Sequence, residues 1–342
     1  MSREMSQTVL QRVISGETLT RLEMDQWLSN VVSGRESEPV IAAVLSTLAF
    51  RGESVSELSG ALDALKRVMV PFPSNQLLPL LDTCGTGGDG MGTFNISTTV
   101  AIVLAAGGIP VVKHGGRAVS SRSGSADVLE ALGIRVDLPV ERSLEIFSEL
   151  GIVFLWAPLY HPALKGLAPL RRSLQIRTLL NMIAPLANPA GVTRQILGVS
   201  SEKMVSPMAQ LLMAHGSKEF IVISGQGLDE VTLEGRTTFA LGRGGEIHEG
   251  YLTPRDFGLP LVPVGAICGG TPSENASIMR RVLSGEEGPY MDYVLANAAL
   301  GFQVAGLVDG PLEGVKMARS VVMSRRAEQL LDRWGELCQT QS

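Results

Sequence analysis

The hydrophobic residues of roughly the first seventy positions follow the spacing of amphipathic helices. Apolar side chains recur every three or four positions in residues 19–31, 41–48 and 55–65. This period predicts helices that each bury one face. The third repeat begins with Ser54 and Glu57, which form the pattern of a capping box. A segment with two prolines, residues 70–73, follows and predicts the end of this helical unit.

Beyond this unit, short apolar runs alternate with longer helical repeats. The runs that predict strands cover residues 77–83, 109–114, 152–158, 194–200 and 219–225. The helical repeats between them cover residues 97–108, 125–133, 140–151 and 208–216. Strands that alternate with helices predict right-handed crossovers and a mainly parallel sheet. Residues 230–253 instead carry short β and turn signals, and two long helical stretches close the chain.

These patterns predict an α/β protein with two domains. The first, over residues 1–72, is a small helical domain. The second, over residues 73–163 and 189–342, is a large α/β domain with a mainly parallel central sheet. A helical stretch with two prolines, residues 164–188, interrupts the second domain. We expect this stretch to pack with the helices of the first domain.

Composition and charge exclude several classes of function. The chain of 342 residues is 45% hydrophobic, which is enough for a sizeable core. Its formal net charge of −5 argues against a general nucleic-acid-binding protein, which is normally basic. The three cysteines are far apart, so neither a disulfide framework nor a zinc site is indicated. The sequence has no signal peptide and no run long enough to span a membrane, so we expect a cytoplasmic protein.

A glycine-rich loop, GTGGDG at residues 85–90, follows the first predicted strand. In open α/β sheets, ligands bind beyond the carboxyl ends of the strands, and glycines let backbone N–H groups approach phosphate oxygens. NAD would require an acidic residue at the end of the next strand, whereas this strand ends in Lys113 and His114. The Walker pattern is also absent. The loop therefore predicts a phosphate ligand bound in neither the usual NAD mode nor the usual ATP mode.

A second polar loop follows the next predicted strand. Its sequence, KHGGRAVSSRSGSAD at residues 113–127, contains three cations and four serines. The segment NIST, residues 95–98, adds polar side chains at a helix start. Cations and short hydroxyl donors at two neighbouring strand ends suit a ligand with more than one phosphate.

Together these loops closely resemble those of the anthranilate phosphoribosyltransferases of tryptophan biosynthesis. Further motifs extend the resemblance over nearly the whole chain: FLWAPLYHPALKGLAPLRRSLQIRTLLN, PLANPAG, GLDEV and LTPRDFGL. The resemblance implies a homodimer with a fold similar to that of class II nucleoside phosphorylases. It also implies an Mg²⁺-dependent transfer of ribose 5-phosphate from phosphoribosyl pyrophosphate (PRPP) to the amino group of anthranilate, with release of pyrophosphate.

The resemblance also implies the roles of individual residues. The positions that would bind PRPP are Gly85, Gly88, Asp89, Thr93, Asn95, Ile96, Ser97, Thr98, Lys113, Arg117, Ser120, Ser121 and Ser125. The positions that would bind anthranilate are Gly85, Gly116, His161, Arg171 and Pro185. The positions that would bind Mg²⁺ are Ser97, Asp229 and Glu230. No side chain is expected to act as nucleophile or as acid or base, because the aniline nitrogen has a free lone pair at neutral pH.

Three positions depart from the family pattern. Gly116 stands where the family has an asparagine that contacts anthranilate, Ala184 replaces a glycine beside the acceptor, and Ser224 replaces a histidine. The donor and metal positions are intact, so the departures concern the acceptor more than the donor. Three interpretations stay open: an anthranilate phosphoribosyltransferase, a paralogue with the same donor and another aromatic or amine acceptor, and a non-catalytic anion-binding regulatory dimer. A nucleoside phosphorylase is disfavoured by the NIST and SSRSGSAD motifs.

Overall fold

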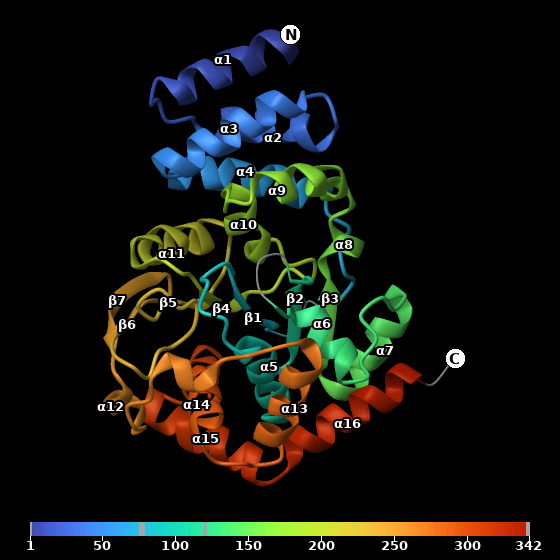
Figure 1. Cartoon of the computed structure of the whole chain (residues 1–342), viewed down its shortest axis with the longest axis vertical. Coiled ribbons are helices and arrows are strands. Elements are labelled where there is room, and N and C mark those ends of the chain that lie inside the picture. Colours follow the sequence, from blue (N-terminus) through green and yellow to red (C-terminus); the bar gives the residue numbers. More distant parts are fainter. Residues whose placement is uncertain (1, 75–78, 119–121, 340–342) are drawn as a thin grey trace.

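The first helices of the chain form a bundle at one end of the molecule (Figure 1). The structure, a computed structural model, describes residues 2–74, 79–118 and 122–339. The bundle helices are α1 (Ser2–Ile14), α2 (Arg21–Val32), α3 (Glu38–Arg51) and α4 (Val55–Val68). Capping boxes fix the starts of α2 and α4, where Thr20 pairs with Glu23 and Ser54 pairs with Glu57. The capping box predicted from the sequence at Ser54 is therefore confirmed.

A seven-stranded sheet forms the centre of the larger part of the molecule. Its strands are β1 (Leu81–Gly85), β2 (Val111–Gly115), β3 (Ile152–Trp156), β4 (Arg194–Gly198), β5 (Glu219–Ser224), β6 (Thr237–Arg243) and β7 (Glu246–Leu252). Their order is β3-β2-β1-β4-β5-β6-β7. The first five strands are parallel, and β6 and β7 continue the sheet antiparallel. The β6–β7 turn contains Gly244 and Gly245, both at positive φ, as a tight hairpin turn requires.

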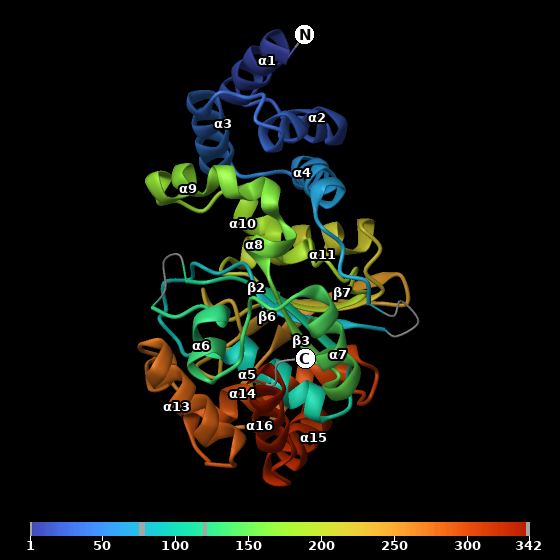
Figure 2. The same cartoon turned by 90° about the vertical axis from the view of Figure 1, so that its right-hand side faces the viewer.

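Helices cover both faces of the sheet (Figures 1 and 2). The α-helices that follow the bundle in the chain are α5 (Ile96–Ala106), α6 (Ser125–Ala131), α7 (Val140–Leu150), α8 (Ala157–Tyr160), α9 (Ala168–Leu174), α10 (Leu179–Ile183), α11 (Val205–Ala214), α12 (Pro254–Phe257), α13 (Pro272–Leu283), α14 (Pro289–Val304), α15 (Pro311–Met323) and α16 (Arg326–Gln339). On one face, Ile196 and Ile221 pack with α5 and α14. On the other, Leu197 and Val222 share an apolar cluster with α11 and the bundle. The strands are apolar on both sides, as expected for a parallel sheet between two helical layers.

The stretch 164–188 lies between the bundle and the sheet (Figure 2). Leu170 of α9 and Leu180 of α10 belong to the same apolar cluster as Trp27 of α2 and Leu62 of α4. We therefore infer that this stretch belongs with the helical domain, although it follows β3 in sequence.

The α/β fold with a mainly parallel sheet, predicted from the sequence, is confirmed. Each predicted apolar run contributes a strand, and the segment 230–253 supplies β6 and β7. The two long helical stretches at the end of the chain each divide into two helices. The second divides at Arg325, a non-glycine residue at positive φ.

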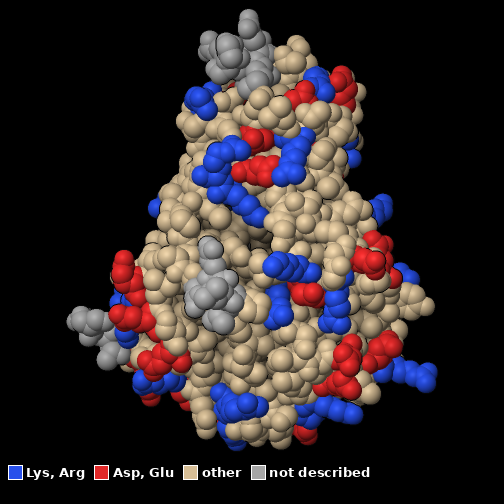
Figure 3. Space-filling view, turned by 180° about the vertical axis from the view of Figure 1, so that it is seen from behind, with Lys and Arg blue, Asp and Glu red and all other residues tan. Residues whose placement is uncertain are grey.

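The surface seen from behind carries interspersed charges rather than one field of a single sign (Figure 3). Exposed arginines pair with carboxylates, as Arg21 does with Asp63 and Arg67 with Asp25. In the part of the chain that the structure describes, no helix has the length and apolar character needed to cross a bilayer.

Candidate active site

The ends of four neighbouring parallel strands meet at one edge of the sheet. β1 ends at Gly85, β2 at Gly115, β4 at Gly198 and β5 at Ser224. The two loops that the sequence predicts to bind phosphate follow β1 and β2, which are adjacent. A third loop, residues 225–231 after β5, carries Asp229 and Glu230, and we call it the acidic loop. The fold therefore gathers loops that are far apart in the sequence.

The acidic loop packs directly on the ends of β1 and β4. A Cβ atom on Gly198 would lie 1.6 Å from the carbonyl oxygen of Asp229, and one on Gly85 would lie 2.3 Å from its Oδ2 atom. Asp229 Oδ2 also accepts a hydrogen bond of 2.8 Å from the Gly87 N–H. Only glycine fits at both strand ends, and the Asp229 carboxylate consequently lies against the glycine-rich loop.

Glu230 connects the acidic loop to the start of α5. Its Oε1 atom accepts a hydrogen bond of 3.0 Å from the Ser97 N–H, at a helix N-terminus that favours a carboxylate. Burial, together with the charge of Asp89, raises the pKa of Asp229 to about 7. Burial and the charge of Asp229 raise the pKa of Glu230, while Lys113 lowers it.

These carboxylates fit a divalent cation. Asp229 and Glu230 are adjacent, and their like charges in a partly buried site favour a bound counter-charge. Mg²⁺ prefers oxygen ligands and is usually held by one or two carboxylates together with water and substrate phosphates. The Ser97 hydroxyl, on the residue that bonds Glu230, adds a further oxygen.

Lys113 reaches the same point from β2. Its buried ammonium group donates to the carbonyl oxygen of Thr83 and, at 3.2 Å, to Ser97 Oγ. Burial lowers the pKa of Lys113, and the charges of Asp82 and Glu230 raise it. A cation is therefore held beside the start of α5, where the sequence predicts phosphate.

Hydrogen bonds join the NIST segment, residues 95–98, directly to the second polar loop. Thr98 Oγ1 lies 3.0 Å from Ser125 Oγ, and Asn95 Nδ2 donates to the Ser123 carbonyl at 3.1 Å. Thr93 forms a β-bridge with Cys268, which ties the glycine-rich loop to the segment before α13. Three further residues that are predicted to bind PRPP lie in the same region. Gly88 and Asp89 lie within the glycine-rich loop, and Ile96 begins α5.

Arg117 is engaged in ion pairs with α6. Its Nη1 atom lies 3.0 Å from Asp127 and 2.6 Å from Glu130, and its guanidinium stacks 5.4 Å above the ring of Trp156. A contact between Arg117 and a ligand therefore requires these ion pairs to be shared or opened. The other predicted positions of this loop, Ser120 and Ser121, lie outside the described residues.

Two histidine rings face each other near the end of β2. The ring centroids of His114 and His161 are 5.0 Å apart, and His161 Nε2 donates to the Ala187 carbonyl at 3.1 Å. His114 Nε2 and His161 Nδ1 are buried without a hydrogen-bond partner among the described residues. Burial lowers the pKa of His114 to about 3 and also lowers the pKa of His161, so both rings are neutral at pH 7.

The other predicted acceptor positions come from separate elements. The side chain of Arg171 in α9 has neither a hydrogen bond nor an ion pair with any described residue, and burial lowers its pKa. The Pro185 carbonyl accepts a 2.8 Å hydrogen bond from Gln195 Nε2. Gly116 is not at positive φ, and a Cβ atom placed on it would meet no heavy atom within 4 Å. A partly buried guanidinium without a counter-charge is costly, so Arg171 favours an anionic ligand.

A cavity of about 550 Å³ separates the bundle from the ends of β1 and β4. Phe50 of α3, Thr86 of the glycine-rich loop, and Ser200 line it together with Arg177. The Arg177 Cδ atom lies 3.0 Å from the position of a Cβ atom on Gly88, and its guanidinium donates to Ser200 Oγ. The sequence pattern does not single out Arg177, because nothing in the helical stretch 164–188 indicates contact with a loop so distant in the chain.

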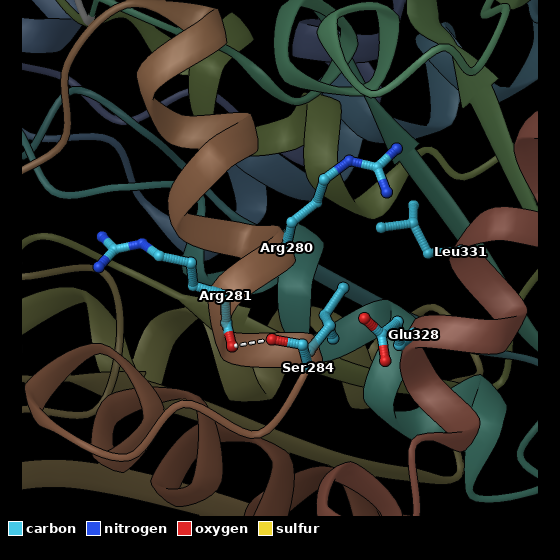
Figure 4. A pocket seen from close by; sticks show the side chains of 6 residues that line it. Arg280, Arg281, Ser284, Glu328 and Leu331 are labelled. Carbon is cyan, nitrogen blue, oxygen red and sulfur yellow. Dashed lines mark hydrogen bonds between the residues drawn. The ribbon is translucent and has the colours of Figure 1, made fainter.

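A smaller hollow of about 170 Å³ lies between α13 and α16 (Figure 4). Its two arginines already have carboxylate partners: Arg280 lies 3.0 Å from Asp332, and Arg281 lies 2.7 Å from Glu286. Both helices belong to the layer on the side of the sheet away from the bundle (Figure 1). The hollow is therefore separate from the loops that carry the predicted site residues.

Comparison with known proteins matches both domains to one family. The helical bundle domain of a glycosyl transferase family matches residues 7–69, and the α/β domain of that family matches residues 77–328. The anthranilate phosphoribosyltransferase of Phenylobacterium zucineum is 41% identical over 333 residues, which cover 96% of this chain and 97% of the relative.

Solved structures that are similar to this chain are also anthranilate phosphoribosyltransferases. The anthranilate phosphoribosyltransferase of Thermus thermophilus superimposes with a TM-score of 0.90 at 40% identity, covering 97% of this chain and 99% of that one. The enzyme of Saccharomyces cerevisiae in complex with PRPP and Mg has a TM-score of 0.87 at 26% identity, covering 97% of each chain. The yeast enzyme has also been solved with 4-fluoroanthranilate, with a TM-score of 0.84, 26% identity, and coverage of 97% of this chain and 98% of that one.

The close approach at Gly198 generates a prediction about stability. We expect Gly198→Ala to lower the free energy of unfolding by about 2–3 kcal/mol, because the added methyl group overlaps the Asp229 carbonyl and forces the acidic loop to move. Gly265→Ala is the matched control, because Gly265 has a permissive φ and no heavy atom within 4 Å of a Cβ position. Urea unfolding of the two variants measures the difference. Equal stabilities would contradict the steric argument.

Proposed function

Because the chain belongs to the anthranilate phosphoribosyltransferase family, we propose that it transfers the 5-phosphoribosyl group of PRPP to the amino group of anthranilate and releases pyrophosphate. The observation that carries the proposal is the convergence of the glycine-rich loop, the start of α5, Lys113 and the acidic loop at the ends of neighbouring strands. Three direct hydrogen bonds join these four elements, which together provide N–H groups, a cation and carboxylates for a ligand with several phosphates.

The donor binds at the two polar loops in this proposal. Gly88 and Gly90, both at positive φ, expose backbone N–H groups to phosphate oxygens. Lys113 and the N-terminus of α5 favour negative charge at the same place. Ser97, Asp229 and Glu230 would hold Mg²⁺, which supplies electrostatic stabilisation of the leaving pyrophosphate.

The acceptor binds on the side of Arg171 and the two histidines. The Arg171 guanidinium pairs with the anthranilate carboxylate, which offsets the cost of its burial. His114 and His161 are neutral, so they add no positive charge on the acceptor side. An aromatic amine held between these groups meets the donor from the side opposite its leaving group.

The reaction then needs positioning more than acid–base chemistry. The amine lone pair forms the new bond to the anomeric carbon, the bond to pyrophosphate breaks with its electron pair, and the nitrogen loses a proton. Positive charge develops on the ribose, and negative charge on the departing pyrophosphate. Lys113 and the backbone N–H groups of the glycine-rich loop lie where that negative charge grows. Holding the amine next to the carbon supplies much of the remaining rate.

We propose further that the protein is a cytoplasmic homodimer that associates through its helical domain. Phe50 of α3 is 95% exposed, and Ile14 and Leu22 of the same domain are each 64% exposed. Apolar side chains of this size favour a partner surface. The thiols of Cys84 and Cys338 are buried and unpaired, as is usual in a reducing compartment.

The dimer proposal predicts that Phe50→Asp yields a monomer. A carboxylate at the interface would be desolvated on association, whereas in the monomer it stays in water. Sedimentation equilibrium of the wild type and the variant measures their masses, and Tyr251→Asp in β7, which is also exposed, is the control. A wild type that sediments as a monomer would refute the proposal.

Arg171→Ala is expected to raise the KM for anthranilate by about a hundredfold and to leave the KM for PRPP within about twofold. Loss of a charge-assisted hydrogen bond is worth about 1.5–3 kcal/mol, and only the acceptor is assigned to this guanidinium. Steady-state kinetics with each substrate varied in turn make the comparison. Arg172→Ala, on the exposed side of α9, is the matched control. Equal losses for both substrates would contradict the assignment.

Gly116→Asn is expected to lower the KM for anthranilate by about threefold to tenfold, the value of one net hydrogen bond, with little change for PRPP. Gly116 is not at positive φ and has space around its Cβ position, so the amide enters without strain. Wild type and variant are assayed side by side for anthranilate consumption and pyrophosphate release. A wild type that leaves anthranilate untouched while the variant consumes it would favour a paralogue with another acceptor.

A further inference from the structure

We propose that three buried asparagines, Asn275, Asn188 and Asn297, are positioning residues that each hold one part of the site: the donor loop, the acceptor segment and the acidic loop. None of them is among the residues assigned to contact a ligand. Their side chains are 1%, 3% and 1% exposed, respectively. The inference rests on the proposed function, because it assigns each asparagine to one ligand of that reaction.

Asn275, in α13, orients the donor-site residue Asn95. Its Nδ2 atom donates to Asn95 Oδ1 at 2.8 Å, and its Oδ1 atom accepts from the Gly270 N–H at 2.7 Å. Asn95 Oδ1 also accepts from Ser123 Oγ at 3.3 Å, while Asn95 Nδ2 donates to the Ser123 carbonyl. These bonds fix which end of the Asn95 amide points in which direction, so the amide is oriented before any donor binds.

Asn188 holds the segment that carries Pro185 and Ala187 against the sheet. Its Nδ2 atom donates to Asp82 Oδ2 of β1 and to the Val112 carbonyl of β2, both at 2.8 Å. Its Oδ1 atom accepts from the Ala190 N–H at 3.0 Å. The Ala187 carbonyl, next to Asn188, is the partner of His161. Asn188 thereby sets the position of the acceptor-side groups.

Asp82 extends this contact to the second histidine. Its Oδ1 atom accepts from the His114 backbone N–H at 3.2 Å, while its Oδ2 atom is occupied by Asn188. The two histidines that face each other are thus both connected to Asn188, one through Asp82 and one through the Ala187 carbonyl.

Asn297, in α14, fixes the backbone immediately after Glu230. Its Oδ1 atom accepts from the Val231 N–H at 3.0 Å, and its Nδ2 atom donates to the Tyr293 carbonyl at 2.9 Å. Because Val231 follows the last carboxylate of the acidic loop, this bond sets where that carboxylate can point.

Each position requires an amide, because each side chain accepts from an N–H group and donates to an oxygen. Aspartate has nearly the same shape but cannot donate, so it places an oxygen against an oxygen at all three sites. Asn→Asp variants therefore keep the volume of the side chain and remove one hydrogen bond at Asn275 and at Asn297 and two at Asn188. If the asparagines only stabilised the fold, the variants would lower the melting temperature or the fraction of active protein, and they would not weaken the binding of one ligand more than that of the others.

The test compares three variants, Asn275→Asp, Asn188→Asp and Asn297→Asp, each of which is a control for the other two. Losing one hydrogen bond to a buried group predicts an effect of about tenfold. We expect the KM for PRPP to rise in Asn275→Asp and the KM for anthranilate to rise in Asn188→Asp. In Asn297→Asp, the affinity for Mg²⁺ with PRPP present, measured by calorimetry, should fall. In each variant the other two constants should stay within about twofold of the wild type.

Loss of the same constant in all three variants, or a lower melting temperature with every constant unchanged, would overturn the proposal. If an aspartate variant does not fold, the serine variant at that position replaces it, because a hydroxyl both donates and accepts, and the same ligand preference is expected. If the wild type lacks activity on anthranilate, the proposed function fails by itself. The donor and metal parts of the inference are then still decided by calorimetry with PRPP and Mg²⁺.

Discussion

The contact between the acidic loop and the ends of β1 and β4 is the constraint on which the rest of the site depends. The loop can approach only because Gly85 and Gly198 have no side chains. The approach places the Asp229 carboxylate on the Gly87 N–H and the Glu230 carboxylate on the first turn of α5. Lys113 then completes the arrangement from the neighbouring strand. A displacement of the loop would therefore separate the carboxylates, the helix start and the cation from one another.

The site also holds charge that the folded chain does not fully balance. The Arg171 side chain has no partner among the described residues. Burial raises the pKa values of Asp229 and Glu230, and a neighbouring carboxylate raises each further, Asp89 for Asp229 and Asp229 for Glu230. Such groups reduce the stability of the free protein but need no rearrangement when the ligand brings the opposite charge. Substrate and metal binding should therefore stabilise the fold, because they bind the native state alone.

Much of this organisation could be predicted from the sequence, and the reason differs from element to element. The period of the apolar residues predicts the sheet and the bundle, and the glycines after β1 predict a phosphate loop, because both signals are local. The ion pairs of Arg117 with Asp127 and Glu130, and the contact of Arg177 with Gly88, could not be predicted, because they depend on how side chains pack across elements. Nor could the asparagines of α13 and α14 be connected to the site, since each meets its partner only in the folded chain.

The residues proposed to bind the acceptor and those proposed to bind the donor are anchored to different pieces of the chain. The donor and metal loops belong to the α/β domain, whereas Arg171 belongs to α9, which packs with the bundle, and Pro185 lies in the segment that Asn188 holds to the sheet. A change in the acceptor segment consequently leaves the hydrogen bonds of the donor loops untouched. Evolution can thus change the residues that bind the amine while the loops that bind PRPP and Mg²⁺ stay the same. Ala184, in the segment that Asn188 holds to the sheet, is a substitution of this kind, whereas Gly116 lies in the loop after β2.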